Sequence, residues 1–126
     1  MQTASHDSQI LKGVLGLVLL HLIDERESYG YELVERVHGI GLTDVPDGSI
    51  YPALGRLERD GHVTSRLVPS PSGPARKYYR LSPSGHDLLA VRGAAWLRLV
   101  EAVTPLFNPN GRGPTGGTPR PRLRSS

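Results

Sequence analysis

The sequence predicts a mainly α-helical fold with one small β-hairpin, and three observations support this. Between residues 9 and 60, three stretches carry apolar side chains at helical spacing, separated by Gly- and Pro-containing breaks. Two short segments between residues 62 and 81 then alternate around a tip of Pro, Ser and Gly. A longer helical stretch follows from about residue 83. The predicted element order is therefore helix, helix, helix, hairpin, long helix.

The first predicted helix covers about residues 9–25 and is apolar on most of its sides. A helix this apolar is buried twice, against its own domain and against another surface. It is interrupted by Lys12 and is shorter than the roughly 20 residues that span a bilayer, so we expect no membrane insertion. Residues 1–8 before it are polar, and we expect them to be disordered.

The second and third helices are predicted from their boundary residues. Ser28 is a plausible N-cap for a helix over about residues 29–38, and glycines end that helix. The third helix covers about residues 49–60 after a turn-forming cluster. Pro52 must then lie in its first turn, where a missing N–H is tolerated. The two helices and the tight break between them form a helix-turn-helix.

The hairpin is predicted from strands over residues 62–68 and 75–81. Alternation puts Arg76 and Tyr78 on one face and Lys77 on the other, beside the second tyrosine of the pair. We expect one of the two tyrosines in the core and the other exposed. Three short helices followed by a hairpin constitute a winged helix-turn-helix, which we assign to residues 9–81.

The last helix begins at the strongest start signal in the chain, Ser82 as N-cap followed by Pro83. It is expected to run to about residue 104, and Pro105 should end or kink it. Apolar residues seven apart, with others between them, form a seam for packing against another helix. Residues 82–107 are therefore predicted to be a C-terminal dimerisation helix. The expected dimer contacts come from the first and the last helix. They are Leu15 and Leu19 of the first helix and Leu89, Trp96, Leu99, Val100 and Val103 of the last.

Net charge is less informative than its distribution. The chain carries 15 Lys or Arg and 12 Asp or Glu, a formal net charge of +3. Residues 1–107 are net −1, whereas residues 108–126 are net +4, so the basic pI comes from the tail. Residues 56–80 alone are net +4, which is the positive region that favours nucleic-acid binding. The Gly-, Pro- and Arg-rich tail 108–126 is expected to be disordered.

Four sequence blocks carry a resemblance to a known family. They are LKG at residues 11–13, YGYEL at 29–33, GSIYPAL at 48–54 and RKYY at 76–79. In this order and spacing they closely resemble the PadR family of transcriptional regulators, over about residues 9–107. One departure is Ala75, where many members carry another basic residue, which thins the positive charge of the wing.

The resemblance implies a homodimeric repressor that binds a pseudo-palindromic operator in double-stranded DNA and leaves it when an effector binds. The single helix after the wing resembles the smaller PadR subgroup. With the third helix in the major groove, its N-terminal residues and the basic wing would contact DNA. Two alternatives stay open: Tyr51 packs between the third helix and the wing, and Arg56 pairs with a neighbouring carboxylate. The candidate DNA-binding residues are Ser49, Tyr51, Arg56, Arg59, Arg66, Arg76, Lys77 and Tyr78.

Trp96 is the only tryptophan. In some small PadR members an equivalent aromatic lines a pore at the dimer interface and stacks on flat apolar ligands. The resemblance therefore makes Trp96 a candidate contact for a small planar aromatic effector. The alternative is that Trp96 is simply part of an interface core.

Other classes of function find little support. The chain has no cysteine, which excludes disulfides and thiolate chemistry and suits a reducing compartment, so we expect a cytoplasmic protein. Its five histidines show no metal-ligand spacing, and no catalytic constellation is visible, so we expect no metal, no cofactor and no enzymatic activity. A winged helix that binds another protein is the competing class, although such a module more often has a neutral or acidic wing.

Overall fold

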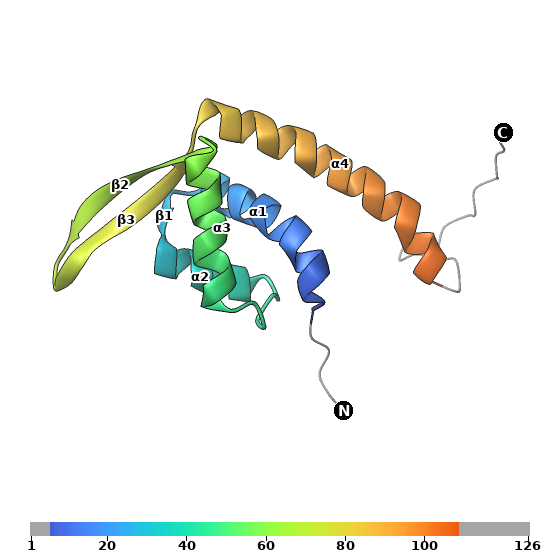
Figure 1. Cartoon of the computed structure of the whole chain (residues 1–126), viewed down its shortest axis with the longest axis horizontal. Helices are drawn as coiled ribbons and strands as arrows, with labels where there is room; N and C mark the ends of the chain where they lie inside the picture. Colours follow the sequence, from blue (N-terminus) through green and yellow to red (C-terminus); the bar gives the residue numbers. More distant parts are fainter. Residues whose placement is uncertain (1–5, 109–126) are drawn as a thin grey trace. The chain divides into compact units, whose positions relative to one another are not determined.

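The computed structural model describes residues 6–108 and confirms a mainly helical chain with a small sheet and a long last helix (Figure 1). It divides into two compact units, Met1–Val91 and Arg92–Ser126, which are described separately. The elements are α1 (Ser8–Glu25), β1 (Ser28–Tyr29), α2 (Gly30–Gly39), α3 (Asp47–Arg59), β2 (Val63–Ser70), β3 (Gly73–Leu81) and α4 (Pro83–Phe107).

The start of α1 is fixed by side-chain capping. Asp7 accepts hydrogen bonds from the backbone N–H groups of Gln9 and Ile10, at 2.8 and 3.3 Å. The backbone N–H of His6 donates to Asp44 Oδ2 at 2.6 Å, which attaches the chain to the loop before α3. Residues 6–8 therefore belong to the fold, contrary to the expectation of disorder, while residues 1–5 lie outside the described residues.

The core lies where α1, α2 and α3 meet. Leu33, Ile50 and Leu54 have no exposed surface, and α1 contacts both α2 and α3. Leu15 and Leu19, expected at a dimer interface, are 6% and 0% exposed within the single chain. That expectation is corrected, because helices of the same chain already cover these two side chains.

A two-residue strand, β1, was not predicted. Its Ser28 and Tyr29 pair with Tyr79 and Tyr78 of β3, giving a three-stranded sheet of order β1-β3-β2. Ser28, expected to cap α2, is instead fully buried in this sheet. Tyr29 takes the N-cap position, and its backbone N–H donates to the Glu32 carboxylate at 3.4 Å.

The hairpin β2–β3 is longer than predicted, because pairing continues to Ser70 and Gly73. One of the two tyrosines, Tyr79, is buried in the core as expected. The other, Tyr78, is half-buried and not fully exposed. Figure 1 shows the hairpin extending away from the three helices. The strands form the wing of a winged helix whose helix-turn-helix is α2–α3.

Proline positions correct two helix boundaries. Because α3 begins at Asp47, Pro52 is in its second turn and not its first. The missing N–H leaves the carbonyl of Gly48, an exposed residue, without its helical partner. Pro105 does not end α4, which continues to Phe107; only the last two residues of the helix follow it. The predicted tail lies outside the described residues from 109 onward.

The start of α4 is attached to the turn that follows α3. Ser82 is the expected cap: its hydroxyl accepts from the backbone N–H of Gly85 at 3.1 Å and donates to the Gly61 carbonyl at 2.6 Å. A Cβ on Gly85 would collide with the carbonyl oxygen of His62, so only glycine fits at this close approach. The first turn of α4 is thereby held against the α3–β2 turn.

Candidate nucleic-acid interface

One face of α3 is buried and the opposite face is open. Ile50, Leu54 and Leu57 point into the core, as the helical spacing predicted. The candidate residues of α3, namely Ser49, Tyr51, Arg56 and Arg59, are all exposed. Charged and hydroxyl groups on an exposed helix of this kind can contact phosphate oxygens or base edges.

Tyr51 is positioned by a glycine of α2. Its side chain is 44% exposed, and a Cβ on Gly30 would lie 2.7 Å from its Cε1, so the ring packs directly against the start of α2. Partial burial, followed by the charge of Asp47, raises the pKa of the Tyr51 hydroxyl. The hydroxyl therefore stays protonated near neutral pH and can donate a hydrogen bond. No pattern in the sequence indicates that Gly30 supports Tyr51.

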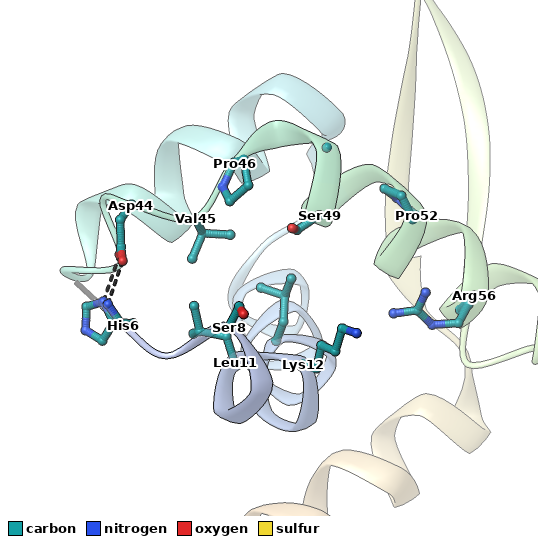
Figure 2. A pocket seen from close by; sticks show the side chains of 12 residues that line it. His6, Ser8, Leu11, Lys12, Asp44, Val45, Pro46, Ser49, Pro52 and Arg56 are labelled. Carbon is teal, nitrogen blue, oxygen red and sulfur yellow. Dashed lines mark hydrogen bonds and ion pairs between the residues drawn. The ribbon is translucent and has the colours of Figure 1, made fainter.

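Ser49 and Arg56 lie on the side of α3 that faces α1 (Figure 2). Both line a cavity shared with α1, together with Lys12. Within residues 6–108, Arg56 makes no ion pair with any carboxylate, so the alternative of a structural partner for Arg56 is not supported.

The outer face of the wing carries alternating cations and aromatic rings. The Arg76 guanidinium lies 4.6 Å from the Tyr29 ring centroid, and that ring is 5.3 Å from Tyr78 at 55°. The Arg66 guanidinium lies 6.0 Å from the ring of Tyr78. These cation–π contacts restrict both guanidinium groups to the same face of the sheet.

Arg66 is also held by a carboxylate. Its Nε and Nη2 donate to the two carboxylate oxygens of Glu27 at 2.7 and 3.0 Å, a bidentate pair. This hydrogen bonding holds the pKa of Glu27 below its ordinary value. The positive charge of Arg66 is therefore already partnered in the free protein.

Lys77 is paired on the opposite face of the wing. Its Nζ lies 2.9 Å from Glu58 Oε1, and the Ser65 hydroxyl donates to Glu58 Oε2 at 2.6 Å. The hydrogen bond from Ser65, and then that from Lys77, lowers the pKa of Glu58. Arg59 and Arg76 are exposed and have no carboxylate partner among the described residues. Counting charges in the sequence could not distinguish Arg59 and Arg76, which lack a carboxylate partner within residues 6–108, from Arg66 and Lys77, which have one.

The second unit, residues 92–107 of α4, presents unburied apolar side chains. Trp96 is 38% exposed and Leu99 is 56% exposed, and the end of the helix adds Leu106 and Phe107. Of the other expected dimer contacts, Val103 is exposed, whereas Leu89 and Val100 are half-buried. An apolar surface of this extent is typical of an interaction site.

Between residues 6 and 108, no group of three or more His, Cys, Asp or Glu side chains is arranged to hold a metal ion. None of the helices in the same range combines the length and apolar character needed to cross a bilayer.

Comparison with known proteins agrees with this geometry. The model of the transcriptional regulator PadR-like family matches residues 19–91. The transcriptional regulator Rv3488 of Mycobacterium tuberculosis is 33% identical over 94 residues, covering 73% of this chain and 84% of that protein. A PadR-like transcriptional regulator from Bacillus cereus has a crystal structure with a TM-score of 0.71 and 37% identity, covering 79% of this chain and 97% of that one. A Streptococcus transcriptional regulator gives a TM-score of 0.72 at 37% identity, covering 81% of this chain and 100% of that one.

Proposed function

This chain belongs to the PadR-like family of transcriptional regulators, and on that premise we propose that it is an effector-responsive repressor in the cytoplasm that binds a pseudo-palindromic operator as a homodimer. The observation that carries the proposal is the open face of α3 beside a wing whose Arg76 has no carboxylate partner within residues 6–108. Membership of a family of regulators also argues against a catalytic role.

The proposed contacts to DNA have different roles. Tyr51, supported by Gly30, donates to a phosphate as α3 enters the major groove, and Ser49 bonds a phosphate or a base edge. The arginines without carboxylate partners, Arg59 and Arg76, follow the phosphates. The remaining candidates, Arg56, Arg66, Lys77 and Tyr78, complete the interface at its edges.

The proposed dimer forms through α4. Its support is the exposed apolar surface of Trp96, Leu99 and Val103, which a second copy would bury. Leu89 and Val100 are half-buried, so only their remaining exposed surface would contribute to the proposed dimer interface. Trp96 is the proposed contact for a small planar aromatic effector, because its ring is large and partly exposed.

The test is a selection of bound duplexes from random DNA, followed by binding measurements on the selected sequence at several salt concentrations. The proposal expects a pseudo-palindromic sequence and an affinity that falls steeply as salt rises. If the folded, dimeric protein enriches no particular DNA sequence, the proposed function is wrong.

A matched pair of glycine variants tests the role of Tyr51. Gly30→Ala places a methyl group against the Tyr51 ring and should weaken operator binding by about tenfold, the loss of one good contact. Gly39→Ala lies in the same helix with open space around the new methyl group and should leave binding unchanged. Circular dichroism of both variants checks that α2 remains folded.

A winged helix that binds a protein partner is the second candidate. It is favoured by the internal pairing of Arg66 and Lys77, which reduces the free positive charge of the wing. The same selection discriminates the two functions, because a protein-binding module would enrich no DNA sequence.

A further inference from the structure

A cavity of about 340 Å³ lies between the first turns of α1 and the N-terminal half of α3. This volume is at the lower end of the range of small-molecule pockets in proteins. The lining comes from α1, the loop before α3 and α3 itself, so the cavity is contained within the first unit. The cavity therefore adjoins the helix that we propose to read DNA.

The cavity has an acidic end and a basic end (Figure 2). At one end the Asp44 carboxylate is bound by His6, through the backbone N–H at 2.6 Å and the ring Nδ1 at 2.8 Å. At the other end the side chains of Lys12 and Arg56 extend toward one another from α1 and α3. The carboxylate is thus already satisfied, and the two cations are not.

Neither Lys12 nor Arg56 makes an ion pair or a side-chain hydrogen bond within residues 6–108. Both side chains are exposed and come from different helices, so an anion bound at this end of the cavity would interact favourably with both positive charges. Ser49, on the same side of α3, adds a hydroxyl donor to the lining.

Apart from Ser8, the rest of the lining is apolar or glycine. Leu11 is half-buried and Pro46 and Pro52 are exposed, so these three offer accessible apolar surface, whereas Leu15 and Val45 are buried. Apolar walls gain nothing from an inorganic ion or a DNA phosphate, but they contribute by burying a hydrocarbon or aromatic body. The combination is complementary to a molecule with one apolar part and one anionic group.

We propose that this cavity binds a small organic carboxylate, with the carboxylate between Lys12 and Arg56 and the apolar body against Leu11 and Pro52. The site is separate from the one proposed at Trp96, which lies in the second unit. Its regulatory consequence rests on the proposed function: a ligand that engages Ser49 and Arg56 removes both from DNA and weakens operator binding.

The experiment uses the full-length, ¹⁵N-labelled protein without DNA, titrated with benzoate and, as a matched uncharged control, benzyl alcohol. The proposal expects saturable amide shift changes at Lys12, Ser49 and Arg56 with benzoate and none of comparable size with benzyl alcohol. The double variant Lys12→Gln/Arg56→Gln should weaken benzoate binding by about tenfold or more, the loss of charge-assisted hydrogen bonds. Arg80→Gln, which removes an exposed cation of β3, should leave benzoate binding unchanged.

Four outcomes overturn the proposal. Absence of saturation by benzoate, or equal affinity for benzyl alcohol, excludes a carboxylate site. Inorganic phosphate that produces the same shifts and competes with benzoate assigns the cations to the DNA backbone instead. Unchanged benzoate affinity in the double variant places the ligand elsewhere, and thermal unfolding of that variant verifies its fold. Operator binding is measured separately, so a protein that binds benzoate but not DNA retains the site and loses only the proposed function.

Discussion

Two helices of this chain have similar apolar sequences and opposite surroundings. In α1 the apolar side chains face α2 and α3, and Leu19 has no exposed surface. In residues 92–107 of α4 the apolar side chains are open, and Leu99 is 56% exposed. Apolar density in a sequence therefore shows that a helix needs to be covered, but not whether the same chain or another molecule covers it.

The same distinction holds for adjacent cations of β3. Lys77 is paired with Glu58 at 2.9 Å, whereas Arg76 lies over an aromatic ring and has no carboxylate partner within residues 6–108. Adjacent basic residues of the sequence are thus unequal in the charge that they offer to DNA.

The largest expected effect tests the covered helix. Leu19→Ala leaves a cavity in the core and should lower the free energy of unfolding by about 2–5 kcal/mol. Ile10→Ala, in the same helix but at a side chain that is 66% exposed, should cost about 0.5 kcal/mol or less. Urea denaturation of both variants gives the comparison, and equal losses would show that α1 is not the buried helix described above.

The open helix is tested by introducing charge. Leu99→Glu with Val103→Glu would place two carboxylates in the proposed dimer interface and should raise the dimer dissociation constant by about a hundredfold or more. Leu67→Glu puts the same charge on an exposed leucine of β2 and should leave the dimer intact. Sedimentation equilibrium measures both, and a dimer that survives the double substitution would move the interface away from this surface.

A smaller effect is expected at the unpaired cation. Arg76→Ala should weaken operator binding by up to about tenfold and reduce the slope of log affinity against log salt by about 1, as expected for one lost phosphate contact. Arg92→Ala removes an exposed arginine of α4 and should change neither quantity. Fluorescence anisotropy at several salt concentrations reports both, and an unchanged slope would remove Arg76 from the interface.

The smallest expected effect concerns the ion pair between Lys77 and Glu58. Because hydrogen bonding lowers the pKa of Glu58 below its ordinary value of 4.5, the stability that this carboxylate contributes is present above about pH 4.5 and is lost as pH falls through the lowered pKa. Glu58 is partly solvated, so the contribution should be below about 1 kcal/mol. Glu58→Gln should therefore lose less stability between pH 6 and pH 3 in urea denaturation than the unmodified protein. A parallel decline in both would show that the pair is not stabilising.

Local signals predicted the order of the elements, because caps, breakers and periodicity act over a few residues. Ser82 is the clear case, since its hydroxyl caps α4 as its position before Pro83 indicated. The strand β1 could not be predicted in this way, because Ser28 and Tyr29 become a strand only through pairing with β3, about fifty residues later.

The candidate site was predicted by residue type but not by environment. All of the candidate cations are exposed, as expected of an interface. The pairing of Glu27 with Arg66 joins residues 39 positions apart, and the packing of Gly30 on Tyr51 depends on how α2 meets α3. Contacts of this kind arise from the tertiary fold, so neither the local charge count nor the helical periodicity of the sequence could predict them.

The first turn of α4 is hydrogen-bonded to the turn that joins α3 to β2. The hydroxyls of Ser82 and Ser84 both donate to the Gly61 carbonyl, at 2.6 and 3.0 Å, and Gly85 packs against His62. The beginning of α4, residues 83–91, is therefore a structural part of the winged-helix unit and not only of the helix proposed to form the dimer.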